Sequence, residues 1–71
     1  MRRLTAKEYE QTVLINPNSI FFKYTNREDA HSSYASKFAN PRFNSDELFV
    51  YEVIGLGYVV QTTGSLVKAS V

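Results

Sequence analysis

The sequence contains no cysteine and no tryptophan, and only two prolines, three glycines and one histidine. Without cysteine the chain has no disulfide, no thiol nucleophile and no cysteine-based zinc site, and this predicts a cytoplasmic protein. One histidine is too few for a transition-metal site within one chain, so we expect no metal and no cofactor. No apolar run approaches the roughly 20 residues that span a bilayer, so we expect no membrane partner.

The length and charge of the chain set further bounds. Its 71 residues leave room for one small domain, which we expect to comprise residues 1–71. Eight basic residues nearly balance seven acidic ones, so the total charge favours neither nucleic acid nor a membrane surface. Aromatic residues make up 14% of the chain, which argues against disorder.

A helix start lies near the N-terminus. Thr5 and Glu8 have the spacing of a capping box, and this predicts a helix that begins at about Ala6. Residues 12–15 could continue this helix or begin a strand, and Pro17 follows as a stop in either case.

The same spacing recurs in the middle of the chain. Thr25 and Glu28 repeat the capping box and predict a helix over residues 27–39. Apolar side chains follow at intervals of four, which indicates one buried helix face: Ala30, Tyr34 and Phe38.

Strands are predicted on both sides of the second helix. Residues 19–24 are rich in aromatic and branched side chains, and residues 48–54 and 58–63 flank a Gly-Leu-Gly turn that predicts a hairpin. Residues 66–71 are expected to form a last edge strand. Whether residues 44–54 begin as helix or strand is left open, with strand favoured.

Together these elements predict an α+β fold in a single small domain. We expect the two short helices to pack on one face of a three- to four-stranded, mainly antiparallel sheet. The core is expected to contain seven side chains: Tyr9, Ile20, Phe22, Tyr34, Phe38, Val50 and Ile54.

The strand over residues 48–54 is apolar on both faces, and this feature suggests a function. If both helices cover one face, the other must be buried by a partner. We therefore expect a small non-catalytic protein-binding module, an adaptor or inhibitor of the kind found among phage accessory proteins. It would bind another protein or itself as a homo-oligomer, through four residues: Phe49, Tyr51, Val53 and Tyr58.

An uneven charge distribution supports nucleic-acid binding as the alternative. Residues 1–43 hold seven basic groups against four acidic ones, whereas residues 44–71 hold one against three. Aromatic stacking and phosphate contacts are typical of proteins that bind RNA or single strands. Five residues of the basic half could supply them: Phe21, Lys23, Arg27, Arg42 and Phe43.

Catalysis has weaker support. Helical spacing brings His31 near Arg27 and Tyr34, with Glu28 close in sequence, and small ribonucleases use these residue types in acid–base chemistry. Residue types alone do not make a site, and a lone histidine on a helix is most often structural. We therefore assign no catalytic residue and expect the protein not to be an enzyme.

The run of residues 48–56, Leu-Phe-Val-Tyr-Glu-Val-Ile-Gly-Leu, resembles the first strand of a small linker domain. That domain occurs in cyanobacterial phycobilisome rod caps and at the start of some ferredoxin-NADP reductases. The resemblance covers nine residues, and it implies a strand at this place but no function or site residue.

Overall fold

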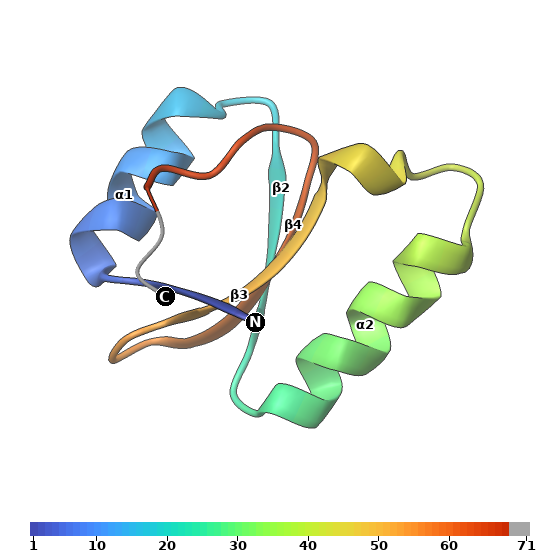
Figure 1. Cartoon of the computed structure of the whole chain (residues 1–71), viewed down its shortest axis with the longest axis horizontal. Helices are drawn as coiled ribbons and strands as arrows, with labels where there is room; N and C mark the ends of the chain where they lie inside the picture. Colours follow the sequence, from blue (N-terminus) through green and yellow to red (C-terminus); the bar gives the residue numbers. More distant parts are fainter. Residues whose placement is uncertain (69–71) are drawn as a thin grey trace.

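The computed structural model describes residues 1–68, and Figure 1 shows them as a sheet between two helices. The helices are α1 (Ala6–Ile15) and α2 (Arg27–Ala39). The strands are β1 (Arg2–Leu4), β2 (Ile20–Tyr24), β3 (Leu48–Val53) and β4 (Gly57–Thr62), and one 3₁₀ turn, η1 (Ser45–Glu47), precedes β3. The α+β prediction is confirmed.

The sheet has the order β1-β3-β4-β2, so the last strand along the chain lies inside and β2 lies at an edge. β3 and β4 form the predicted antiparallel hairpin, and β4 also pairs antiparallel with β2. β1 pairs parallel with β3, which makes the sheet mixed. This first strand has only three residues, which are too few to show the alternating pattern that predicts a strand.

The expectation that both helices cover one face is wrong, because α1 and α2 lie on opposite faces (Figure 1). Tyr9 of α1 packs against Tyr51 and Val59, whereas Ala30 of α2 packs against Val60. We call these sides the α1 face and the α2 face.

Strand order explains this arrangement. Pairing makes β1, β2 and β3 run in the same direction. The connection through α1 therefore crosses the sheet from β1 to β2, and the connection through α2 returns from β2 to β3. Two crossovers of the same handedness that travel in opposite directions must use opposite faces.

The helix starts follow from capping. In α1, the Thr5 amide donates to Glu8 Oε1 at 2.8 Å and the Glu8 amide donates to Thr5 Oγ1 at 3.1 Å, as the predicted capping box requires. In α2 the cap lies one residue later than predicted, because Asn26 rather than Thr25 accepts from the Asp29 amide, at 2.9 Å.

The predicted last strand is absent from residues 63–68, and residues 69–71 lie outside the described part of the chain. Residues 63–68 instead cross the α1 face as an irregular segment, which we call the C-terminal strap (Figure 1). Asn16 fixes the strap with a donated bond to the Ser65 carbonyl at 2.6 Å and an accepted bond from the Ser65 amide at 2.8 Å. Leu66 of the strap packs on the core.

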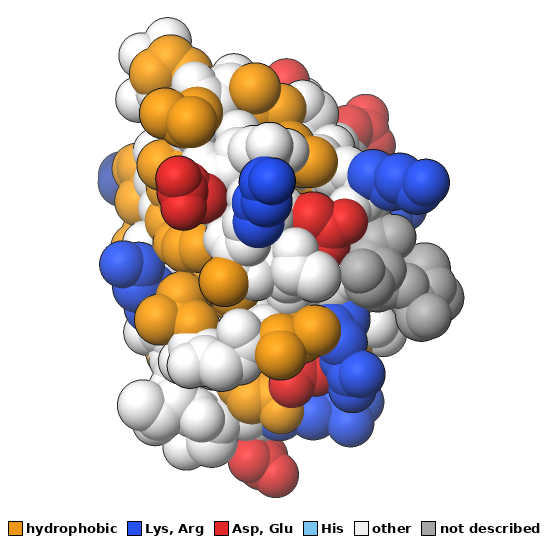
Figure 2. Space-filling view, turned by 90° about the vertical axis from the view of Figure 1, so that its left-hand side faces the viewer, with side chains coloured by type: hydrophobic (Ala, Val, Ile, Leu, Met, Phe, Trp, Pro, Cys, Tyr) orange, Lys and Arg blue, Asp and Glu red, His pale blue; other side chains and the backbone are white. Residues whose placement is uncertain are grey.

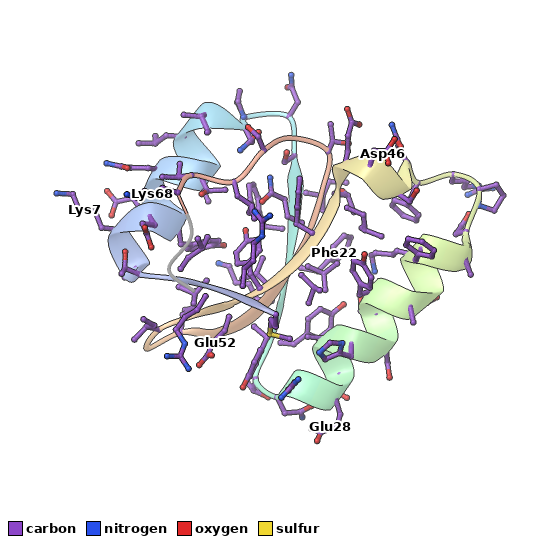
Figure 3. The ribbon with its side chains drawn as sticks, viewed as in Figure 1. Lys7, Phe22, Glu28, Asp46, Glu52 and Lys68 are labelled. Atoms are coloured by element: carbon purple, nitrogen blue, oxygen red, sulfur yellow. The ribbon has the colours of Figure 1, made fainter. Side chains whose placement is uncertain are left out.

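The predicted core is partly confirmed. Tyr9, Phe22, Tyr34 and Val50 all pack against one of the two buried clusters, and Figure 3 shows Phe22 between the sheet and α2. The other three side chains are about half exposed, so their assignment to the core is wrong: Ile20, Phe38 and Ile54.

Candidate protein-binding groove

The four residues predicted to contact a partner do not form one surface. Tyr51 and Val53 are fully buried on the α1 face, and Phe49 is half-buried beside them. Tyr58 packs in the cluster under α2, on the opposite face. The folded chain therefore uses this apolar strand as its own core, with one helix on each side.

Tyr51 illustrates how well this core is satisfied. Its hydroxyl donates to Oε1 of buried Gln61 at 3.0 Å, and Gln61 Nε2 donates to the Thr63 carbonyl at 3.3 Å. Burial raises the pKa of Tyr51 well above its ordinary value, and the nearby Tyr9 adds to the rise. Such a side chain stabilises the fold and is not free to contact a partner.

Exposed apolar side chains lie instead on the part of α1 that meets β2. Leu14 is 72% exposed and Val13 is 37% exposed, and both line the same groove. Figure 2 looks onto the α1 side and shows hydrophobic side chains collected along one margin of it. An apolar cluster of this kind on a small domain is typical of a contact surface.

Between α1 and β2 lies an open groove of roughly 610 Å³. Helical spacing brings one stripe of α1 to it, and strand alternation adds two side chains of β2. Tyr9 and Phe21 meet edge to face at its base, with ring centroids 6.0 Å apart. Seven residues line the groove: Ala6, Tyr9, Glu10, Val13, Leu14, Phe21 and Lys23.

Within residues 1–68, β2 pairs only with β4, so the groove runs beside an open sheet edge. The Thr63 amide donates to the Glu47 carbonyl, which continues the β3–β4 ladder and makes the odd-numbered residues of β4 bond to β3. The even-numbered residues of β4 then bond to β2. Register therefore turns the backbone N–H and C=O groups of Phe21 and Lys23 outward.

The groove carries one charge of each sign. Glu10 and Lys23 both line it, and within residues 1–68 neither makes an ion pair or side-chain hydrogen bond. By contrast, Arg3 and Glu52 pair at 3.2 Å near the hairpin. The groove therefore offers two unused charged side chains beside its apolar stripe.

The five residues predicted to bind nucleic acid are not brought together. Phe21 and Lys23 line the groove on the α1 face. Arg27 is the first residue of α2, and Arg42 and Phe43 follow its end, so 13 helical residues, about 20 Å, separate them. These side chains form no common strip for a strand of nucleic acid.

The residues considered for catalysis make local contacts of α2. Arg27 Nε donates to His31 Nε2 at 3.4 Å, and both residues are exposed. Within residues 1–68, no group of three or more His, Cys, Asp or Glu side chains could hold a metal ion. Among the described residues, His31 therefore has one side-chain partner, Arg27.

A second polar cluster joins α2 to the sheet. Ser33 Oγ accepts from the Tyr24 hydroxyl at 2.6 Å and from Lys37 Nζ at 2.7 Å. The Lys37 ammonium also lies 4.1 Å from the centroid of the Phe22 ring, a cation–π contact. These contacts fix α2 on its face of the sheet.

Part of the groove could be predicted from the sequence. Alternation correctly places Phe21 and Lys23 on one face of their strand, but residues 12–15 could be read as helix or strand. Once they are helical, as here, Glu10 and Leu14 fall one turn apart on the stripe that meets β2. The open edge depends on strand order, which has no local signal.

Comparison of the chain with protein-family models, with curated proteins and with solved structures finds no significant match. Within the described residues, neither helix is long and apolar enough to cross a membrane.

Proposed function

We propose that this chain is a small protein-binding module that holds an extended segment of its partner along β2, in the groove beside α1. One observation supports this proposal above the others. In the described part of the chain, an unpaired strand edge and an exposed apolar stripe lie next to each other beside the same groove.

The open edge determines the form of the partner. The outward N–H and C=O groups of Phe21 and Lys23 can be satisfied by another extended backbone, as in recognition by strand addition. Natural sheets normally shorten, charge or cover an edge of this kind. Here Lys23 is the one charged residue of a five-residue strand, so the edge is only weakly protected.

The apolar stripe would supply binding free energy and specificity. A strand added at β2 would place alternate side chains on the α1 face, against Val13 and Leu14. Burying a side chain of leucine size contributes about 1.5–3 kcal/mol. In this proposal the module acts without catalysis, as an adaptor or inhibitor, and the absence of cysteine suits a cytoplasmic location.

A capture experiment with a matched control tests the proposal. Tagged wild-type protein, Leu14→Glu and Leu56→Glu are incubated with lysate of the source organism, with and without nuclease treatment in parallel, and the lysate also contains an untagged copy of the chain. Leu14 is 72% exposed in the groove, and Leu56 is 51% exposed in the hairpin turn, so neither change should disturb the fold.

We expect Leu14→Glu to lose a protein that both wild type and Leu56→Glu retain, with an unchanged circular dichroism spectrum for all three. Equal capture by wild type and Leu14→Glu would contradict the proposed groove. Loss of all captured material on nuclease treatment would instead favour nucleic acid as the partner.

A further inference from the structure

We propose that the segment bound in the groove is β2 of a second copy of this chain, so that two sheets join at their β2 edges around a twofold axis. This inference rests on the proposed function and names its partner. An isologous contact of this kind uses the same surface on both copies, and the groove offers the complementary features that such a contact needs.

Backbone parity restricts how the two strands can pair. Among the residues of β2, only Phe21 and Lys23 turn their N–H and C=O groups outward, so these residues must form the hydrogen-bonded pairs of an antiparallel ladder. A twofold axis at Phe22 places Phe21 opposite Lys23 of the second copy, and Lys23 opposite Phe21 of the second copy. In this register, each of the five residues of β2 lies opposite a residue of β2 in the second copy.

Charge favours the same register. Pairing Lys23 with its own copy would set two ammonium groups face to face, which is destabilising. The register centred at Phe22 instead carries Lys23 of the second copy into a groove lined by Phe21 and Glu10. There the ammonium group meets an aromatic ring and an unused carboxylate, and symmetry makes this contact twice.

Each helix has a definite place beside the contact. α2 packs over β3 and β4 and reaches β2 through the side chains of Phe22 and Tyr24 on the α2 face, so these contacts do not use the outward backbone groups of Phe21 and Lys23. On the other face, α1 lies beside β2, so a twofold axis at the edge would bring the two α1 helices together. Their meeting surface would be the exposed apolar stripe that includes Val13 and Leu14.

A charge exchange tests this inference by sedimentation equilibrium. The samples are wild type, Lys23→Glu, Glu10→Lys and the double variant that exchanges the two charges, each over a wide concentration range, with Leu56→Glu as control. Wild type and the control should approach twice the chain mass of 8.1 kDa as concentration rises. Each single variant should weaken self-association about tenfold, because attraction becomes repulsion at two symmetric positions.

The double variant should recover association to within about threefold of wild type, since it restores both opposite-charge contacts. Wild type that stays monomeric up to about 1 mM would overturn the inference. So would a dimer that neither single variant weakens, or one that the double variant fails to restore. If the dimer is absent while Leu14→Glu still loses a captured protein, the proposed function stands and its partner is a different chain.

Discussion

Replacing Asn16 with alanine should remove a large part of the stability of this domain. Asn16 is 7% exposed at the end of α1. Its amide donates to the carbonyls of Thr12 at 2.7 Å and Ser65 at 2.6 Å, and its oxygen accepts from the Ser65 amide at 2.8 Å. The side chain thus ties the C-terminal strap to the helix over the α1 face.

The magnitude follows from these three bonds. Each contributes about 1 kcal/mol, and Asn16→Ala would also leave groups of the strap without a partner, so we expect a loss of about 3 kcal/mol. The total free energy of unfolding of a domain of this size is about 4–10 kcal/mol. The midpoint of thermal unfolding should therefore fall by about 12–24 °C.

Urea and thermal unfolding, followed by circular dichroism, measure this effect. Asn18→Ala is the matched control, because Asn18 is exposed in the same turn and has no side-chain hydrogen bond within residues 1–68. It should change stability by no more than about 0.5 kcal/mol. Equal stability of Asn16→Ala and Asn18→Ala would refute the role assigned to the strap.

Three further predictions concern the core, the hairpin and the first helix. Because burial raises the pKa of Tyr51 in the folded chain, the unfolded chain ionises first, so the contribution of Tyr51 to stability should be complete below about pH 10 and be lost as the pH rises above it; urea titrations should show a smaller fall for Tyr51→Phe. Gly57→Ala should destabilise by at least about 2 kcal/mol, because a Cβ would lie 2.6 Å from the Tyr24 carbonyl oxygen at a φ of +132°; an unchanged urea midpoint would contradict this. Thr5→Ala should cost about 1 kcal/mol through loss of the bond from the Glu8 amide, and Thr5→Ser should restore most of it in the same assay.

Local signals predicted the elements well. The capping box at Thr5 and the glycines around Leu56 gave the first helix and the hairpin, because their bonds lie within a few residues of chain. The parallel pairing of β1 and the placement of helices on opposite faces could not be predicted, since both depend on strand order across the whole sheet.

The predicted contact surface depended on the placement of the helices. Val50 and Tyr51 point to opposite faces of β3, and both faces are apolar. Such a strand suits a partner surface when one face is bare, and it suits a core when each face carries a helix. Sequence periodicity cannot distinguish these cases. It predicts which side of a helix is apolar, but it does not predict on which face of the sheet that helix packs.

Hydrogen exchange at the β2 edge tests the central claim most directly. The amides of Phe21 and Lys23 face outward, whereas that of Phe22 bonds to β4. In dilute protein we expect Phe21 and Lys23 to exchange fast and Phe22 to be protected. At high protein concentration, the amides of Phe21 and Lys23 should gain protection in wild type. In the Lys23→Glu variant, the amide of Phe21 should gain none. If both outward amides stay unprotected wherever the chain associates, association does not occur by strand addition at β2, and the account is contradicted.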